Sequence, residues 1–254
     1  MNLKLKVELG KNYKSLRQKA RVITENWISE NYKCPFCGGR LETFPNNNKC
    51  SDFYCTKCNE KFELKSKKGK FTNRISGSNY KTTLEKIMSS ENPNWILLEH
   101  DGLNVTGLIL IPKSFIYDEM IIARKPLGEN ARRAGWQGCI IDLSKLPSFG
   151  KIRCIENGKC IESKIINYRL KQNAHFQNNN FKEKGWKLEI LSYIDSLPDN
   201  IFTYNQMKEY FPKLKETHPN NNYIDKKVSQ ILQQLRDIGY IKFIDNNGLY
   251  MKIF

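Results

Sequence analysis

Two pairs of cysteines place the strongest constraint on how this chain of 254 residues can fold. The first pair is Cys34-Pro-Phe-Cys37 and the second is Cys55-Thr-Lys-Cys58, with 17 residues between them. Two C-x-x-C pairs at this separation are typical of a zinc ribbon, in which four thiolates bind one Zn²⁺ tetrahedrally and leave no open position. We therefore expect a structural zinc at these four residues. Cys50 is near enough to compete as a ligand, and the alternative is a set of scattered buried thiols.

The other cysteines fit a reducing compartment. The first residues contain no apolar core of the length that a signal peptide needs, and the longest apolar run, residues 107–111, is too short to span a bilayer. We therefore expect a cytoplasmic protein whose cysteines are thiols or metal ligands rather than disulfides. Cys139, Cys154 and Cys160 have no paired spacing and are expected to be ordinary thiols in strands or loops.

The net charge of the chain is +16, which points to nucleic acid or another polyanion as the partner. The charge is unevenly distributed along the sequence. Residues 1–181 contain 31 basic and 17 acidic side chains, whereas residues 182–254 contain 11 and 9. If DNA is bound, we expect the first segment to neutralise most of the phosphates.

Acidic and basic residues surround the second cysteine pair in the order found in PD-(D/E)xK nucleases. Asp52 precedes the pair, and Glu63-Leu64-Lys65 follows it on a segment that alternates as a strand, so Glu63 and Lys65 share one face. Asp52, Glu63 and the carbonyl of Leu64 would hold Mg²⁺, and Lys65 would orient or deprotonate the attacking water. The alternative for Glu63 and Lys65 is a solvated strand face.

A helix is predicted ahead of the cysteines. Leu16, Ala20, Ile23 and Trp27 recur at helical spacing and form an apolar stripe. Glu25 lies beside this stripe and is either an additional carboxylate near the metal or a surface residue.

The histidines argue against a rival class of zinc-stapled nuclease. HNH enzymes carry catalytic histidines between or beside their cysteine pairs. The histidines of this chain are His100, His175 and His218, and none lies near residues 34–58. We expect them to be structural or solvated.

Two basic clusters are candidates for DNA contact. The first is expected to be a loop that follows the predicted active-site strand and contains Lys65, Lys67, Lys68, Lys70 and Arg74. The second surrounds one tryptophan and contains Arg124, Arg132, Arg133 and Trp136. Its basic side chains could bind phosphates while the indole lies against a base edge, and the alternative is a core tryptophan within a basic surface loop.

The sequence predicts a mixed α/β domain over residues 1–181. A short helix is expected at residues 80–88, and two buried strands at 95–99 and 105–111 are joined by the hairpin dipeptide Asp101-Gly102. An Asn- and Lys-rich segment at 171–184 is expected to be a linker.

Residues 182–254 are predicted to form a winged helix, which is three helices closed by a β-hairpin. The helices are expected at residues 186–194, from a capping box at Thr203 and Gln206 to Phe211, and at 224–238, where Gly239 ends the third. The hairpin strands are expected at 240–244 and 249–253. The third helix would present polar side chains suited to phosphates and adenine edges, namely Lys226, Lys227, Gln230, Gln233 and Gln234.

Taken together, these segments resemble the DpnI-like methyl-directed (type IIM) restriction endonucleases. The likeness extends over nearly the whole chain and is weaker in its last third. It is carried by Cys34-x-x-Cys37, Asp52-Phe53-Tyr54-Cys55-x-x-Cys58, Phe62-Glu63-Leu64-Lys65-Ser66-Lys67-Lys68-Gly69, Arg124-Lys125-Pro126-Leu127, Ala131-Arg132-Arg133-Ala134-Gly135-Trp136, Asp142-Leu143-Ser144, Gly185-Trp186 and Leu235-Arg236-Asp237. One departure is Ser51, which stands where the motif has proline.

The resemblance implies a PD-(D/E)xK catalytic domain with structural zinc, followed by a winged helix. It also implies Mg²⁺-dependent cleavage of double-stranded DNA at GATC sites that carry N6-methyladenine, with both domains contacting the methylated site. We expect a monomer in solution. The alternative is a non-catalytic DNA-binding regulator built from a zinc ribbon and a winged helix, which the charge and the helix pattern fit equally well.

Overall fold

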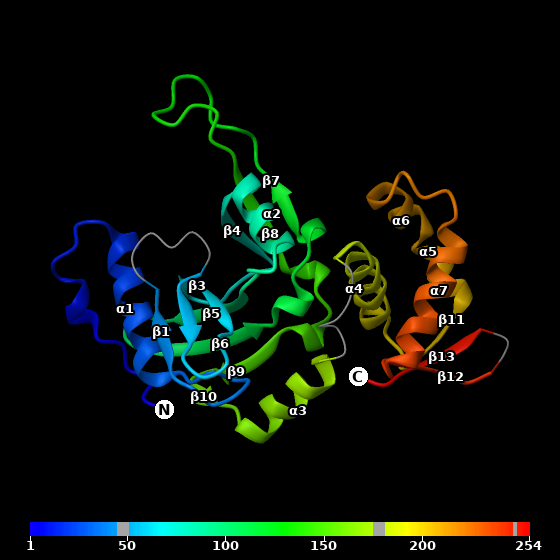
Figure 1. Ribbon diagram of the computed structural model, residues 1–254, viewed down its shortest axis with the longest axis horizontal. Helices are drawn as coiled ribbons and strands as arrows, with labels where there is room; N and C mark the ends of the chain where they lie inside the picture. The colour runs from blue at the N-terminus through cyan, green and yellow to red at the C-terminus, as the bar shows by residue number, and fades with distance from the viewer. Residues whose placement is uncertain (45–50, 175–180, 246–247) are drawn as a thin grey trace. The chain divides into compact units, whose positions relative to one another are not determined.

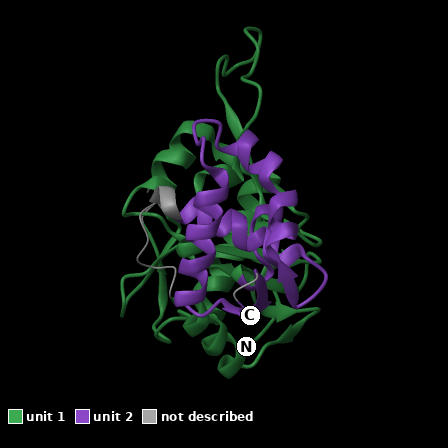
Figure 2. Ribbon diagram, turned by 90° about the vertical axis from the view of Figure 1, so that its right-hand side faces the viewer, with its two compact units in different colours: residues 1–143, 150–174 green, residues 144–149, 175–254 purple. Residues whose placement is uncertain are grey.

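The computed structural model describes residues 1–44, 51–174, 181–245 and 248–254. For residues 181–183 it describes the backbone only. The chain forms two compact units, which are described separately (Figure 2). The first contains residues 1–143 and 150–174, and the second contains residues 144–149 and 175–254.

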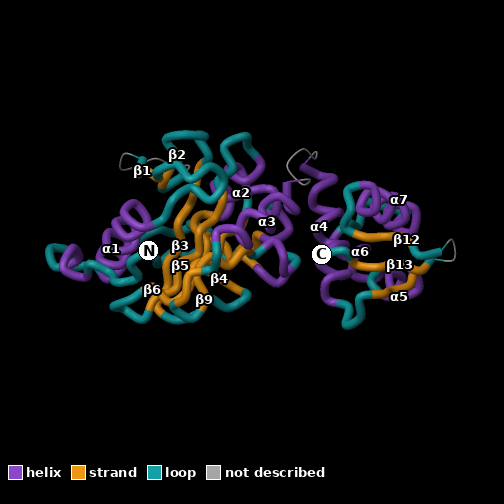
Figure 3. The backbone as a smooth tube through the Cα atoms, turned by 90° about the horizontal axis from the view of Figure 1, so that it is seen from below, coloured by secondary structure: helices purple, strands orange, loops and turns teal. Residues whose placement is uncertain are grey.

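The first unit is built on a seven-stranded sheet in the order β1-β2-β3-β5-β6-β9-β10 (Figures 1 and 3). Only the β3–β5 pair is parallel among the described pairings of this sheet. A smaller sheet has the order β4-β8-β7. The strands are β1 (Leu41–Thr43), β2 (Phe53–Cys55), β3 (Lys61–Lys68), β4 (Arg74–Asn79), β5 (Asn94–His100), β6 (Val105–Ile111), β7 (Ile121–Ala123), β8 (Gly138–Asp142), β9 (Ile152–Glu156) and β10 (Lys159–Cys160).

Three α-helices accompany these sheets: α1 (Leu16–Asn31), α2 (Tyr80–Met88) and α3 (Ser163–Asn173). Short 3₁₀ turns lie at η1 (Val7–Gly10), η2 (Lys113–Phe115) and η3 (Asp118–Met120). Two more, η4 (Leu143–Lys145) and η5 (Ser148–Gly150), overlap residues 144–149, which belong to the second unit. The mixed α/β class expected from the sequence is confirmed. No helix among the described residues combines the length and the apolar character that a bilayer crossing requires.

The central hairpin of the large sheet is confirmed. Six of the seven residues of β5 are buried, and so are six of the seven residues of β6. The side chain of Asp101 accepts hydrogen bonds from the backbone N–H groups of Leu103 and Asn104, both at 2.7 Å. Gly102 has a φ of +111°, a conformation that glycine adopts readily. The turn therefore has a conformation that the Asp101-Gly102 dipeptide favours.

Helix α1 packs on the sheet through its second half. Trp27 and Ile28 are buried in the core, and the indole N–H of Trp27 donates to the carbonyl of Asn2 at 2.9 Å. The prediction that Leu16 belongs to the apolar stripe was wrong, because this residue is 81% exposed. Helix α1 begins at Leu16, so the side chain lies in a first turn that contains no buried residue.

The segment expected to be a basic loop is partly strand. The parallel register of β3 with β5 continues as far as Lys68, which lies opposite His100, so Lys67 and Lys68 belong to the sheet. Arg74 opens β4. Residues 65–68 therefore form a strand despite their positive charge, because their backbone continues to pair with β5. Helix α2 follows β4 as expected, and its N-cap Asn79 accepts from the backbone N–H of Thr82 at 3.0 Å.

The second unit contains α4 (Phe181–Ser196), β11 (Ile201–Thr203), α5 (Tyr204–Glu209), α6 (Phe211–Thr217), α7 (Ile224–Asp237), β12 (Ile241–Phe243) and β13 (Leu249–Lys252). The capping box is present, because Thr203 and Gln206 bond each other's backbone N–H. Gly239 has a φ of +80° just beyond α7, as expected of a residue that ends a helix. A third strand, β11, joins the predicted hairpin in the order β11-β13-β12.

The described part of this unit contains four α-helices where three were expected, because α5 ends at Glu209 and a separate helix, α6, follows from Phe211. Two further features differ from expectation. The proposed linker at 171–184 is helical at both ends, since α3 continues to Asn173 and α4 begins at Phe181, and residues 175–180 lie outside the described part. Residues 144–149 pack within the second unit. Phe149 contacts the rings of Tyr240 and Phe254, with centroids 5.3 and 4.6 Å apart.

Candidate active site and metal centre

The four paired cysteines form one cluster. Their sulfur atoms all lie within 4.8 Å of one another, with Cys34 and Cys58 3.6 Å apart and Cys37 and Cys55 3.4 Å apart. Four sulfurs about 2.3 Å from a tetrahedral zinc would be separated by about 3.8 Å, so the cluster has the dimensions to hold such an ion. Cys50, the competing ligand considered above, lies outside the described residues.

Backbone groups support the sulfurs. The N–H of Gly39 points to the sulfur of Cys37 and the N–H of Lys57 to that of Cys55, both at 3.4 Å. Such bonds favour the thiolate, which is the form that binds metal. A side chain at Gly39 would press against the sulfur of Cys55 at 2.7 Å, so glycine is needed at that position.

The strands beside this cluster bring Asp52 next to Glu63. Phe53 of β2 pairs with Phe62 of β3 in antiparallel register, so Asp52 lies opposite Glu63. The backbone N–H of Asp52 donates to the carbonyl of Phe62 at 2.9 Å, and the carboxylate of Asp52 accepts from the backbone N–H of Leu64 at 2.7 Å. The turn that carries Cys55 and Cys58 connects these two strands. The geometry of the cysteine cluster and that of the acids are therefore linked.

Both acids open into a cleft with a volume of about 460 Å³. The cleft is lined from strands β3 and β4, helices α1 and α2 and the approach to β2. Its residues are Arg17, Ala20, Arg21, Thr24, Glu25, Ser51, Asp52, Glu63, Leu64, Ser66, Ser78 and Lys86. Two carboxylates, a third from α1 and several cations thus share one concave surface.

Glu63 is held between two ammonium groups. Lys65 donates to one carboxylate oxygen and Lys86 to the other, each at 2.8 Å. Burial alone would raise the pKa of Glu63, but the charges of Lys65 and Lys86 outweigh it and lower the pKa to about 2. Glu63 is therefore ionised at neutral pH and is kept in one place.

Asp52 has the opposite electrostatic surroundings. Burial raises the pKa of Asp52, the hydrogen bond from Leu64 opposes this, and the nearby charge of Glu63 adds to it. Burial likewise raises the pKa of Glu25, against the effect of its ion pair with Arg21 at 2.6 Å. A bound cation would stabilise the ionised form of both carboxylates.

Sequence reasoning missed Lys86 and the arginines of α1 that line the cleft, Arg17 and Arg21. The surface interpretation of Glu25 was wrong, because its side chain is only 20% exposed and lines the cleft. Arg21 lies one helical turn before Glu25, a spacing visible in the sequence. Lys86 is 23 residues from Glu63, and no local signal connects them.

The tryptophan-containing basic cluster lies on the long connection between β7 and β8 (Figure 1). The connection is closed on itself by bonds between the backbones of Leu127 and Trp136 and of Gly135 and Leu127. Trp136 is half-buried, its ring lies against Gly138, and the guanidinium of Arg133 sits 5.0 Å from the ring centroid. Arg124, Arg132 and Arg133 are exposed.

Helix α7 presents the expected polar face. Lys226 and Gln230 are exposed, and Lys227 is half-buried and donates to Gln230 at 3.1 Å. Tyr223, at the start of the helix, is 68% exposed and carries the ammonium of Lys226 5.3 Å from its ring centroid. Apolar residues of α7 face inward, with Val228 and Leu235 fully buried.

Comparison with known protein families assigns both parts of the chain. Residues 1–179 match the model of the DpnI family, described as Dam-replacing. The chain belongs to the DpnI family. Residues 182–252 match the family's C-terminal model, described as the Dam-replacing HTH domain. The resemblance inferred from the motifs is confirmed, as is a C-terminal DNA-binding domain of the helix-turn-helix class.

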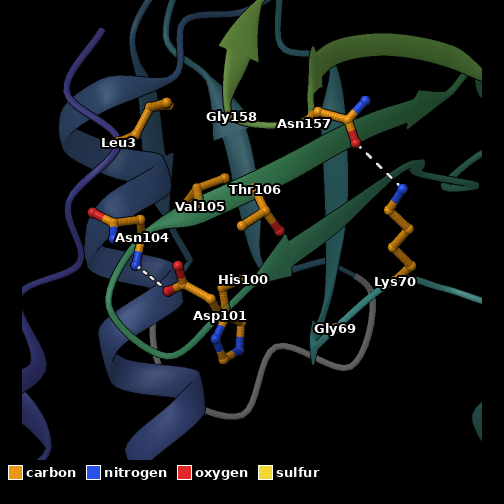
Figure 4. A pocket seen from close by; sticks show the side chains of 10 residues that line it. All are labelled: Leu3, Gly69, Lys70, His100, Asp101, Asn104, Val105, Thr106, Asn157 and Gly158. Carbon is orange, nitrogen blue, oxygen red and sulfur yellow. Dashed lines mark hydrogen bonds between the residues drawn. The ribbon is translucent and has the colours of Figure 1, made fainter.

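A second cavity of the DpnI-family unit, about 620 Å³, lies at the ends of β5 and β6 (Figure 4). Lys70, one of the expected DNA contacts, lines it and donates to Asn157 at 3.2 Å. Asp101, the one acid among the described residues that line this cavity, is already bonded to the backbone of its own turn. Lys67 and Lys68 are exposed on β3 beyond the first cleft. Lys67, Lys68, Lys70 and Arg74 of the expected basic loop are thus not among the residues that line the first cleft, and Lys65, which bonds Glu63, does not line it either.

The donor set of the first cleft fits Mg²⁺ better than zinc. Among the described residues, only the cysteine cluster brings three or more potential ligand atoms within 4.8 Å. Asp52 and Glu63 offer a pair of carboxylates in the cleft, and Mg²⁺ is commonly bound by one or two carboxylates together with waters and substrate phosphate. The two sites therefore suit different ions, as their ligand types indicate.

Proposed function

We propose that this protein is a Mg²⁺-dependent type II restriction endonuclease of the PD-(D/E)xK class that cleaves double-stranded DNA at GATC sites carrying N6-methyladenine. The observation that carries the proposal is the meeting of Asp52, Glu63 and Lys65 on adjacent strands of a DpnI-family chain. A zinc ion at Cys34, Cys37, Cys55 and Cys58 would stabilise the connection between those strands. We further infer that the chain acts as a monomer in the cytoplasm.

The chain's own residues supply the groups that phosphodiester hydrolysis needs. Asp52 and Glu63, with the carbonyl of Leu64, would hold Mg²⁺, which when bound neutralises charge on the phosphate and acidifies the attacking water. Lys65, paired with Glu63 at 2.8 Å, is placed to orient that water or to stabilise the pentavalent phosphorus. Arg17 and Arg21 of α1 line the same cleft and could receive the phosphates that flank the scissile bond.

Trp136 is our candidate for reading the methyl group. Its indole lies on a hairpin connection flanked by Arg132 and Arg133, so phosphate contact and an apolar ring come from one segment. N6-methyladenine places a small apolar group in the major groove, which an indole can cover. One methyl supports only ~1–3 kcal/mol of discrimination. If α7 also recognises the methylated site, through Lys226, Lys227 and Gln230, its preference would multiply the discrimination between methylated and unmethylated DNA.

Digestion of plasmid DNA tests this function. Purified protein with Mg²⁺ should cut adenine-methylated plasmid and leave unmethylated plasmid intact. Equal cutting of both would remove the methyl requirement, and no cutting of either would remove the enzyme. The second candidate, a DNA-binding regulator, rests on the helix-turn-helix domain. Asp52→Ala separates the two, since loss of cutting with retained DNA binding supports the enzyme.

A further inference from the structure

Lys86 contacts the active-site acid Glu63 from a different element. It lies on α2, and its ammonium donates to Glu63 Oε2 at 2.8 Å while Lys65 occupies Oε1 at the same distance. The side chain of Lys86 is 13% exposed, slightly less than the 15% of Lys65. Lys86 also lines the cleft. The PD-(D/E)xK pattern accounts for Lys65 and leaves Lys86 without a role.

We propose that Lys86 is a second active-site cation, a positioning residue that fixes Glu63 and tunes how strongly the cleft binds a divalent metal. The inference rests on the proposed function, because it assigns Lys86 to the same site.

The charges in the cleft indicate whether Lys86 strengthens or weakens metal binding. Glu63 and, when ionised, Asp52 contribute two negative charges, and Lys65 and Lys86 place two ammonium groups against Glu63. Arg21 and Glu25 form an ion pair with each other. With Arg17 also lining the cleft, the acids are at least balanced before a metal enters, so Lys86 opposes metal binding when DNA is absent. A phosphodiester in the cleft adds negative charge, which the same ammonium then stabilises.

Metal binding remains possible while both lysines stay in place. An ionised carboxylate offers about four lone-pair sites. Each oxygen of Glu63 accepts one bond from a lysine, so each retains capacity for a further partner. Lys86 can therefore hold the carboxylate in position without displacing the ion.

A purely structural anchor would behave differently. If Lys86 only tied α2 to β3, its loss would disorder Glu63 and weaken both metal binding and cleavage. A positioning residue with the electrostatic effect described above gives changes of opposite sign: metal binding strengthens and cleavage slows.

The test compares Lys86→Met with wild type in the full-length, zinc-loaded protein. Calorimetric titration with Mn²⁺ alone, without DNA, should show about tenfold tighter binding, because one nearby positive charge is gone. Single-turnover cleavage of methylated plasmid at saturating Mg²⁺ should slow by about tenfold or more. Lys86→Arg should stay near wild type in both. Lys81→Met is the matched control, since Lys81 lies on the same helix with its side chain 86% exposed.

Unchanged or weaker Mn²⁺ binding by a folded Lys86→Met protein would overturn the proposal. Thermal melting verifies the fold, and Lys86→Gln replaces the methionine variant if that variant does not fold. A wild-type protein that binds Mn²⁺ yet cleaves no DNA would refute the proposed function alone, because the Mn²⁺ titration still decides the effect of Lys86 on metal affinity.

Discussion

The carboxylate of Asp52 accepts a hydrogen bond from the backbone N–H of Leu64 at 2.7 Å. This bond joins the residue ahead of β2 to the middle of β3, where Glu63 and Lys65 flank Leu64. An aspartate that holds a neighbouring strand in this way has a fixed oxygen on one side and can present the rest of its carboxylate to the cleft. Asp52 therefore stabilises the contact between the two strands and is also a proposed ligand of the metal ion.

Asp52→Asn should abolish cleavage while stabilising the fold at neutral pH. Burial raises the pKa of Asp52 above its usual 3.8, so its stabilising contribution is complete below pH 3.8 and is lost as pH rises through the raised pKa. Asparagine keeps an acceptor for Leu64 without the charge. We therefore expect a higher unfolding free energy at pH 7 for the variant than for wild type. Urea denaturation in magnesium-free buffer measures it, and a clear loss of stability would contradict this account.

Glu63→Gln should destabilise the protein at neutral pH and lose that effect in acid. The pKa of Glu63 is lowered to about 2 from its usual 4.5, so its stabilising contribution is present above pH 4.5 and is lost as pH falls toward 2. The cost at pH 6 should reach at most ~3 kcal/mol. Denaturation of variant and wild type at pH 6, 4 and 3 should show a narrowing difference. Glu85→Gln, at an exposed position on α2, should show none.

The cysteine cluster should carry one zinc ion per chain. Replacing Cys55 and Cys58 together by serine should abolish bound zinc and cleavage, because the turn between the acid-bearing strands loses its cross-link. Metal analysis by atomic absorption, with plasmid digestion, checks both effects. Cys160→Ser is the control, since Cys160 is exposed and lies outside the cluster. Full zinc content in the double variant would disprove the assignment.

Trp136→Ala should weaken methyl discrimination more than cleavage itself. Removing the indole takes away the apolar surface proposed for the methyl group, so the preference for methylated over unmethylated sites should fall by about 10- to 100-fold. Single-turnover rates on matched methylated and unmethylated duplexes provide the ratio. Leu127→Ala alters an exposed apolar residue on the same connection and should leave the ratio unchanged. Equal slowing on both duplexes by Trp136→Ala would assign the tryptophan to general DNA binding.

Glu189→Ala should destabilise the winged-helix unit. Glu189 on α4 accepts bonds from Thr217 at 3.0 Å and Tyr210 at 3.4 Å and pairs with His218 at 2.8 Å. Its loss leaves three half-buried polar groups without this partner, at a cost of about 2–4 kcal/mol. Chemical denaturation measures the change. Glu209→Ala, an exposed position in the same unit, should cost less than ~0.5 kcal/mol. Similar costs for the two variants would show that the network contributes little.

Local patterns explain why much of the architecture was predictable. The capping box at Thr203, the glycine after α7 and the Asp101-Gly102 turn each depend on residues a few positions apart, so their chemistry is visible in the sequence. The cysteine spacing likewise places four thiols on two short turns. The strand from Phe62 to Lys65 was evident from its alternation, which also puts Glu63 and Lys65 on one face.

Long-range packing decided the parts of the fold and of the cleft that no local pattern predicts. The sequence by itself determined the two cysteine pairs, the acid–acid–base order and the helix-turn-helix pattern, because each depends on local spacing. Only the tertiary structure brought Lys86 of α2 and Glu25 of α1 into the cleft and placed residues 144–149 in the second unit. The physical reason is that ion pairs and burial depend on which distant elements share a surface, and a cation 23 residues from its carboxylate has no local periodicity to reveal it.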